Sequence, residues 1–137
     1  MTFAFTVRGL PQPKGSSRAF VVKGRAVVTS DNPKAREWAK TVRFCLQDWT
    51  RGLLPAAVPV KLTLDFALPR PASVSARRRP APTVKPDVDK LARTVLDALT
   101  GIVVADDAQI VELVVVKRYG QEPGLHGVIE WEGDDGK

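Results

Sequence analysis

Six carboxylate side chains gather in one stretch of the sequence, KPDVDKLARTVLDALTGIVVADDAQIVEL, which spans residues 85–113. They belong to Asp87, Asp89, Asp97, Asp106, Asp107 and Glu112. Each has a structural explanation as a helix cap, a charge near a helix dipole, an ion-pair partner of Arg93 or a turn residue. Together they are harder to explain in this way, because crowded carboxylates repel one another unless a cation lies between them. Oxygen ligands without His or Cys partners favour Mg²⁺ or Mn²⁺ over zinc, so the stretch predicts such a metal site.

A helix over residues 88–99 would position these acids. At about 100° per residue, one apolar arc forms that we expect to be buried, and it consists of Val88, Leu91, Ala92, Val95, Ala98 and Leu99. The opposite side carries Asp89, Arg93 and Asp97. Asp87 precedes the helix as a capping residue, where an extended backbone lets its side chain turn toward the first helical turn. Asp87 and Asp89 can therefore converge at the helix start, while Gly101 supplies a left-handed stop at the other end.

The same stretch resembles the sequence pattern of the RusA family of Holliday junction resolvases. In that family a D-x-D pair opens a helix, a basic residue follows one turn later, DAL comes next, and DDxxI/V leads into a strand. The match is close over residues 85–118 and extends to the Pro-rich loop that follows the first strand. The resemblance implies a small α+β homodimer that binds four-way DNA junctions and cuts them with Mg²⁺, for which Mn²⁺ can substitute. It also implies that Asp87, Asp89 and Asp107 are the metal-binding catalytic acids.

Two residues depart from the family pattern. Asn often follows the D-x-D pair, where this chain has Lys90, and the basic residue on the helix is typically Lys, where this chain has Arg93. A lysine can release a proton in a suitable environment, whereas a guanidinium in practice cannot. Arg93 is therefore expected to act in catalysis by anchoring a phosphate or stabilising developing charge. The source of the leaving-group proton stays open.

The formal charge is unevenly distributed along the chain, whose net charge is +6 over 137 residues. Residues 1–85 hold 16 Lys and Arg against four acids, whereas residues 86–137 hold five against eleven. Such a basic segment favours a polyanionic partner, and a merely solvated basic surface is the plain alternative.

Composition excludes several classes of site. The single cysteine, Cys45, excludes an intramolecular disulfide, and with His126 as the only histidine the usual zinc frameworks are absent. No apolar run approaches the roughly 20 residues of a membrane span, and no signal peptide opens the chain. We therefore expect one cytoplasmic domain over residues 1–132, with a frayed acidic tail at 133–137 and no membrane partner. The family resemblance adds a bacterial or phage-encoded origin.

The remaining patterns predict an α+β fold in which a mixed β-sheet packs against two main helices. Strands are expected at residues 2–9, 58–68, 109–119 and 125–132, with a hairpin over 19–29 that turns at Lys23, Gly24 and Arg25. Ser30 or Asp31 is expected to cap a first helix, with Pro33 in its first turn. We expect an apolar stripe on that helix to pack in the core rather than against bases, and it consists of Trp38, Val42, Cys45 and Trp49.

A long basic segment over residues 69–86 carries five basic residues, five prolines and no acid. It can neither form a regular helix nor bury its charges, so it is either disordered or functional, and we favour a DNA-binding loop. The residues that we expect to contact DNA are Lys14, Arg18, Arg77, Arg78, Arg79, Lys85 and Lys90.

The predicted function is Mg²⁺-dependent resolution of Holliday junctions by paired nicks, in DNA recombination and repair. One alternative is a metal-dependent nuclease of the same build that acts on other branched or single-stranded DNA. The other is a non-catalytic DNA-binding protein whose acids are caps and ion-pair partners, and it would bind DNA equally well without Mg²⁺.

Overall fold

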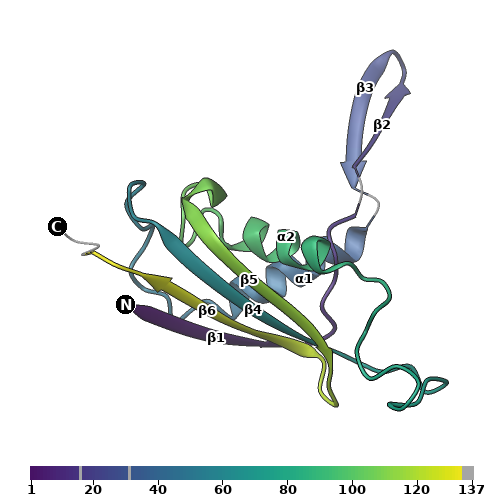
Figure 1. Ribbon diagram of the computed structural model, residues 1–137. Coiled ribbons are helices and arrows are strands. Elements are labelled where there is room, and N and C mark those ends of the chain that lie inside the picture. The colour runs from purple at the N-terminus through teal and green to yellow at the C-terminus, as the bar shows by residue number, and fades with distance from the viewer. Residues whose placement is uncertain (16, 31, 134–137) are drawn as a thin grey trace.

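Four strands form a mixed sheet, and both helices lie on one face of it. The computed structural model describes residues 1–15, 17–30 and 32–133, and for residues 17–20 and 27–30 it describes the backbone alone. The sheet has the order β1-β6-β4-β5 and consists of β1 (Thr2–Arg8), β6 (Gly124–Trp131), β4 (Val60–Leu68) and β5 (Ile110–Tyr119). Figure 1 shows α1 (Pro33–Phe44) and α2 (Val88–Leu99) above this sheet. The predicted α+β class and its mixed sheet are confirmed.

The parallel pairing of β4 with β5 determines the path of the chain through the site. β6 is antiparallel to both β4 and β1, whereas β5 runs parallel to β4, with Val60 beside Ile110 and Leu68 beside Tyr119. Parallel neighbours need a crossover, and here it covers residues 69–109 and contains α2. The chain therefore leaves the sheet at the end of β4 and returns to it at the start of β5.

The hydrophobic core lies between the helices and the sheet. Its fully buried side chains include Val42, Leu62, Leu64, Phe66, Leu91, Val95 and Ile129. The predicted apolar arc of α2 is buried except for Val88, which is 37% exposed because it lines a surface cleft. Thr94 takes part in the buried side instead, and its hydroxyl donates to the Lys90 carbonyl at 3.4 Å. No helix within the described residues is long and apolar enough to cross a membrane.

The N-cap of the first helix lies one residue after Asp31 and two after Ser30, the two caps predicted. Asn32 is its N-cap, and the Asn32 side-chain oxygen accepts from the Lys34 amide at 3.1 Å. Ser30 ends a strand, and Asp31 lies outside the described residues. The helix ends at Phe44, so Trp49 lies beyond it, yet Trp38 and Trp49 are both buried. The core assignment of both tryptophans is thus confirmed, although the helical stripe is shorter than expected.

A two-stranded hairpin stands away from the main sheet (Figure 1) and consists of β2 (Ser17–Val22) and β3 (Arg25–Ser30). Its turn has positive φ at Lys23 and Gly24, where the sequence predicts a turn. Because β2 begins at Ser17, Arg18 belongs to a strand and not to the preceding loop as predicted, and its side chain lies outside the described part.

Gln109 anchors the return of the crossover to the sheet. It is the last residue of the short 3₁₀ helix η1 (Asp107–Gln109), and its side chain is 8% exposed. Its Nε2 donates to the Pro55 carbonyl at 2.9 Å, and its Oε1 accepts from the Ala105 amide at 3.1 Å. Buried polar groups are costly when they lose their partners. Gln109 therefore fixes the segment that carries Asp107 against the loop before β4.

We predict that Gln109→Met lowers the free energy of unfolding by about 1–3 kcal/mol, since the Ala105 amide loses its acceptor and the Pro55 carbonyl keeps only the Val58 amide as a donor. Urea unfolding at pH 7 measures this change. Gln121→Met is the control, because Gln121 is exposed and its replacement should cost less than about 0.5 kcal/mol. Equal losses in the two variants would contradict the anchoring role.

Candidate active site

A cleft of about 420 Å³ lies between α2 and β5. Its charged lining is Asp89, Arg93, Asp97 and Asp107, and its apolar lining includes Leu113 and Val115 of β5. Asp89 and Arg93 are exposed and lie one helical turn apart. Within the part of the chain that the structure describes, no hydrogen bond or ion pair engages the Arg93 guanidinium. A cationic group thus faces the same cleft as carboxylates and is free to bind an anion.

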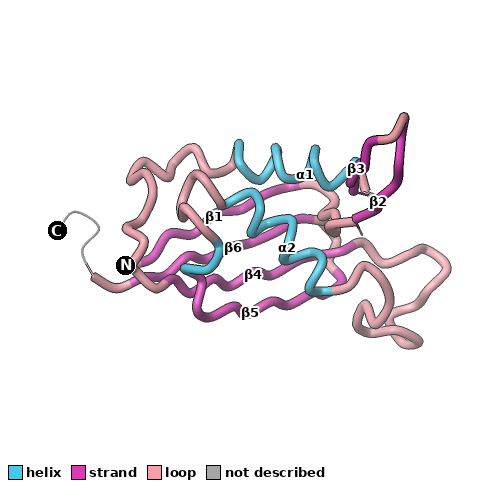
Figure 2. Tube along the Cα trace, turned by 90° about the horizontal axis from the view of Figure 1, so that it is seen from above, coloured by secondary structure: helices cyan, strands magenta, loops and turns pink. Residues whose placement is uncertain are grey.

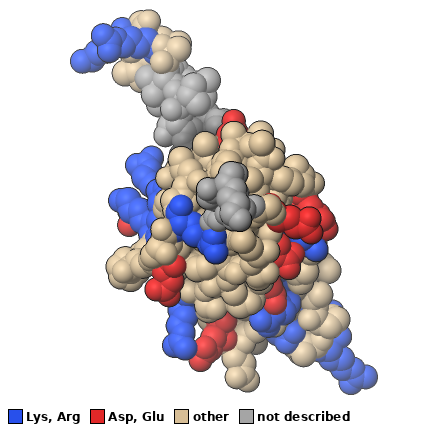
Figure 3. Space-filling model, turned by 90° about the vertical axis from the view of Figure 1, so that its left-hand side faces the viewer, with Lys and Arg blue, Asp and Glu red and all other residues tan. Residues whose placement is uncertain are grey.

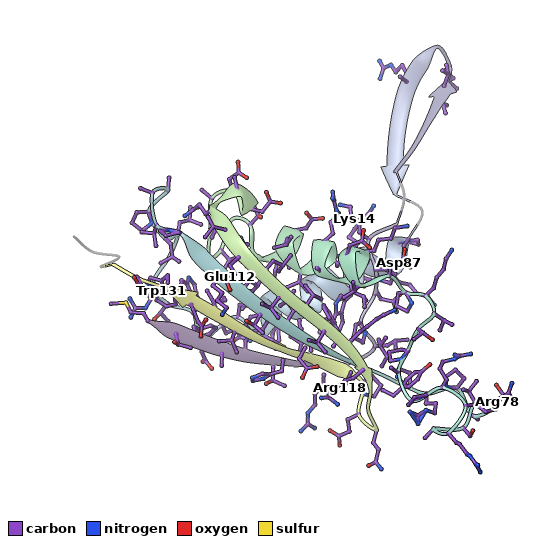
Figure 4. All side chains as sticks on the ribbon, viewed as in Figure 1. Lys14, Arg78, Asp87, Glu112, Arg118 and Trp131 are labelled. Atoms are coloured by element: carbon purple, nitrogen blue, oxygen red, sulfur yellow. The ribbon has the colours of Figure 1, made fainter. Side chains whose placement is uncertain are left out.

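Asp87 lines a different hollow at the start of α2. It is the N-cap residue with φ −70° and ψ 142°, as expected, but its side chain makes no capping hydrogen bond. It borders a groove of about 500 Å³, named here the proline groove, which Lys14, Lys85 and Lys90 also line. Figure 4 shows Lys14 and Asp87 at this end of α2. Asp87 and Asp89 therefore share the helix start but face separate hollows.

Asp107 lies at the far end of the cleft, beyond the last turn of α2. Asp106 caps η1, and its Oδ1 accepts from the Ala108 amide at 3.0 Å. The pair therefore occupies a bend and a 3₁₀ turn that precede the strand. Asp107 is exposed.

Asp87 and Asp107 adjoin segments that lie toward opposite ends of β5. Lys117 contacts the Pro86 carbonyl directly before Asp87, whereas Ile110 directly follows η1 and Asp107. The seven steps from Ile110 to Lys117 span about 23 Å at roughly 3.3 Å per step. Figure 4 likewise shows Asp87 near one end of β5 and Glu112 toward the other. Across the described ranges, no three Asp, Glu, His or Cys side chains are grouped so that they could hold one metal ion.

Lys14, which was expected to contact DNA, forms an ion pair with Asp97 instead. Its Nζ lies 2.7 Å from Asp97 Oδ2, and its backbone amide donates to the Lys90 carbonyl at 2.9 Å. The alternative Arg93–Asp97 pair of the sequence analysis is not formed. Both side chains of the Lys14 pair are more than a third exposed, so the pair adds little stability but holds the N-terminal loop against α2.

The basic loop over residues 69–86 contains no helix or strand, as predicted, and extends beyond the sheet in Figure 2. Arg77 and Arg78 are exposed, and Figure 4 places Arg78 at the outer end of the loop. Arg79 is different, because its guanidinium donates to the Tyr119 hydroxyl at 3.2 Å. The Arg70 guanidinium lies 4.5 Å from the centre of the Tyr119 ring. Tyr119 thus ties the loop to β5 and leaves Arg77 and Arg78 for a partner.

Positive charge is concentrated on projecting elements. The hairpin turn carries exposed Lys23 and Arg25, and blue side chains extend to one side at the upper end of the molecule in Figure 3. Elsewhere on that face, basic and acidic side chains form small separate groups. Lys85 is exposed and Lys90 half-buried, both beside Asp87. The surface could therefore contact a polyanion at several points that surround the acids.

Lys117 is a site residue that the sequence analysis missed. Its Nζ donates to the Val84 carbonyl at 2.7 Å and to the Pro86 carbonyl at 2.8 Å. These two carbonyls flank Lys85, and the second directly precedes Asp87, so Lys117 fixes the entry to α2. The sequence contained a signal for this role, because Lys117 directly follows three valines in the strand. By the alternation of side chains along a strand, Lys117 shares the helix-covered face with Leu113 and Val115.

Comparisons with known proteins found one family model and a bacterial relative that match most of the chain. The family described as Endodeoxyribonuclease RusA matches residues 11–130. The chain is also similar to the uncharacterized protein YqaN of Bacillus subtilis (strain 168), with 31% identity over 134 residues, which cover 91% of this chain and 93% of that protein. The family match includes the crossover, both of its acidic ends and Lys117.

We predict that Lys117→Met loosens the start of α2. Hydrogen exchange measured by mass spectrometry should become several-fold faster at the amides of residues 87–91, because local opening then breaks fewer hydrogen bonds. Lys61→Met is the matched control, since Lys61 lies on β4 and pairs with exposed Glu112 and Glu130. If both variants exchange like the parent protein, Lys117 does not position Asp87.

Proposed function

The chain belongs to the RusA family of endodeoxyribonucleases, and from this premise we propose that it resolves Holliday junctions by paired, Mg²⁺-dependent nicks. The observation that supports this proposal best is the exposure of Asp89, Arg93 and Asp107 to one cleft, with Asp87 in the neighbouring proline groove. Acids with a purely structural role would cap a helix or form an ion pair. Asp87 makes no capping hydrogen bond. The salt bridges of the described residues include none of Asp87, Asp89 and Asp107.

The acids suit a hard divalent cation. Carboxylate oxygens without His or Cys are the donor set that Mg²⁺ and Mn²⁺ prefer. Mg²⁺ is commonly held by one or two carboxylates together with phosphate oxygens of the substrate. We propose that Asp87, Asp89 and Asp107 hold it here, although the described residues group no three acids closely enough to hold one ion. When bound, the ion would supply a nucleophilic water and compensate charge on the scissile phosphate.

Arg93 is the proposed phosphate anchor. Its guanidinium presents several donors in a fixed plane, which matches two oxygens of one phosphate. From the second turn of α2 it would orient the scissile phosphate against Asp89 and stabilise charge that develops on it. It remains charged throughout, so it takes no part in proton transfer.

DNA contacts are proposed around the acids and at the projecting elements. Lys85 and Lys90 would contact phosphates next to the scissile one, because both line the proline groove beside Asp87. Arg77 and Arg78 would contact an arm of the junction further away, and Arg18 would do so from the hairpin. Lys14 would first have to break its ion pair with Asp97, and Arg79 its hydrogen bond with Tyr119, so we propose that these two residues contribute less to DNA affinity.

The proposal includes a homodimer that works in the cytoplasm during recombination or repair of bacterial or phage DNA. Paired nicks need two active sites, and a two-fold dimer presents two sites to a junction that is itself roughly two-fold symmetric.

Cleavage of labelled DNA with and without Mg²⁺ tests the proposal. A four-way junction should be cut symmetrically in Mg²⁺ and left intact in EDTA, while a flap and a linear duplex are cut slowly. Faster cleavage of the flap would favour a nuclease for other branched DNA. Binding without any Mg²⁺-dependent nicking would favour a non-catalytic DNA-binding protein.

We predict that Asp87→Asn, Asp89→Asn and Asp107→Asn each lower the junction cleavage rate at least about a hundredfold. Losing a metal ligand removes several kcal/mol of transition-state stabilisation, and every ~1.4 kcal/mol is a factor of ten. Junction affinity should stay equal or rise, because a negative charge near DNA is removed. Asp106→Asn is the control, since asparagine also caps helices and Asp106 already bonds the Ala108 amide. Near-parental cleavage by all three variants would refute the metal assignment.

For the basic loop we predict a change in salt dependence. Each phosphate contact contributes about 0.9 to the slope of log affinity against log salt, so Arg77→Ala with Arg78→Ala should reduce the slope by about 1.8. Junction and duplex affinity should fall together, because phosphate contacts carry no sequence information. The titration is done in EDTA, and Arg118→Ala, whose partner is Asp65 on the open sheet face, is the control. An unchanged slope would mean that neither arginine contacts a phosphate in the complex.

A further inference from the structure

The proline groove beside Asp87 has apolar walls that the proposed chemistry does not use. It lies where the loop after β1 meets the basic loop and the end of β5, and its volume is about 500 Å³. Six prolines line it, together with apolar side chains that include Leu10, Val84 and Tyr119. Leu10 is 51% exposed and Val84 is 45% exposed, so apolar surface is open to solvent here. Pockets of this size and composition typically bind a small organic group, which a few polar groups hold in one orientation.

Hydrogen bonds and a ring contact fix the walls of the groove. The loop after β1 is tied to α2, because the Lys14 amide donates to the Lys90 carbonyl at 2.9 Å. The Tyr119 hydroxyl accepts from Arg79 at 3.2 Å, and the Tyr119 ring lies 4.5 Å from the Arg70 guanidinium. Proline rings add stiffness, since they fix their own backbone torsion. A ligand that enters such a preformed groove has little side-chain order to impose.

The charged groups of the groove suit a nucleotide. Lys14, Lys85 and Lys90 line it, and Asp87 is the one carboxylate among its described lining residues. Lys14 is engaged by Asp97, whereas within the described part of the chain no hydrogen bond or ion pair engages the side chains of Lys85 and Lys90. A purely apolar ligand would leave these two ammonium groups without partners. A nucleotide satisfies both features, with its base against the apolar walls and its phosphates at the lysines.

We propose that the proline groove binds one unstacked nucleobase of the junction, from a nucleotide next to the phosphate that is cut. The proposal rests on the proposed function and names the part of the substrate that lies beside the metal site. Asp87 lines the groove, and Asp89, at the same end of α2, lines the neighbouring cleft together with Arg93. A phosphate held by Asp89 and Arg93 therefore places an adjoining nucleotide beside the groove.

A four-way junction supplies such a base more cheaply than a linear duplex. In a continuous duplex every base is paired and stacked, and turning one out of the helix costs free energy. Stacking is interrupted at the branch point, so the bases there can leave the helix at lower cost. The groove would therefore add affinity for a junction that a duplex does not gain. The basic loop differs in this respect, because Arg77 and Arg78 would contact the backbone of either DNA.

Binding measured in EDTA tests the proposal without cleavage. The variant carries Leu10→Ser and Val84→Ser, which remove two exposed apolar side chains from the groove and change no charge. It should bind the junction about five- to a hundredfold more weakly, which is the range that one stacked base contributes, and should bind a linear duplex as the parental protein does. Leu53→Ser is the matched control, since Leu53 is 50% exposed in the loop before β4 and should leave both affinities unchanged.

Abasic analogues identify the base. They replace the nucleotides next to the branch point in matched pairs on opposite strands, and the parental protein and the double variant are compared on each junction. At one pair of positions the difference between the two proteins should disappear, because the group that fills the groove is absent. A difference that persists at every position would overturn the proposal, since Leu10 and Val84 would then contact the DNA backbone. No difference on the intact junction would overturn it as well.

Duplex affinity also reports whether the variant folds. If the double variant loses duplex binding too, Leu10→Ser and Val84→Ser are measured singly, and each should show part of the junction-specific loss. Equal losses on junction and duplex in both single variants would contradict a base in the groove.

Cleavage distinguishes this proposal from the proposed function. A parental protein that cuts junctions in Mg²⁺, together with a double variant that binds them normally, overturns the base-binding groove and leaves the function intact. A parental protein that does not cut junctions overturns the proposed function. The measurements in EDTA then still decide whether the groove binds a base, because they need no metal.

Discussion

The parallel pairing of β4 with β5 is the constraint on which the site depends. Parallel neighbours require the chain to travel back along the sheet before it enters the second strand, and α2 is the segment that does so. The acids at the start of α2 and the acid after its end are therefore held at opposite ends of β5. If β4 and β5 were antiparallel and joined by a hairpin, the connection and all of its acids would lie at one end of β5. The split of the acidic set is thus a direct result of strand direction.

Two polar side chains fix the two ends of this crossover. Lys117 binds the carbonyls that precede Asp87, and Gln109 binds backbone groups around the segment that carries Asp107. Both work by satisfying backbone polar groups that would otherwise need water or another partner. Such contacts add modest net stability, but they are costly to break, so they hold the acids in defined places without being catalytic themselves.

Local patterns in the sequence were sufficient to predict the helices and strands, but they were not sufficient to predict the arrangement of the site. The bounds of α2 and its buried arc follow from helical periodicity, and the strand of alternating residues before the basic loop is equally local. Helical periodicity predicts on which face of α2 Asp89 lies, but it does not predict which end of β5 lies beside that face. That depends on the direction of β5, which no short-range pattern encodes. Asp97 shows the same limit, because its partner is Lys14, 83 positions earlier, and not the neighbouring Arg93.

The placement of charge along the chain is consistent with the proposed function in the same physical terms. Neighbouring carboxylates repel one another unless a cation lies between them, so a bound metal would stabilise an acidic segment that is unfavourable without it. Arg77 and Arg78 lie on the basic loop outside the cleft that Asp89 and Asp107 line, whereas Lys85 and Lys90 lie beside Asp87. In the proposed complex these basic groups would bind DNA phosphates while the acids hold the ion, so a chain with net charge +6 can keep an acidic segment.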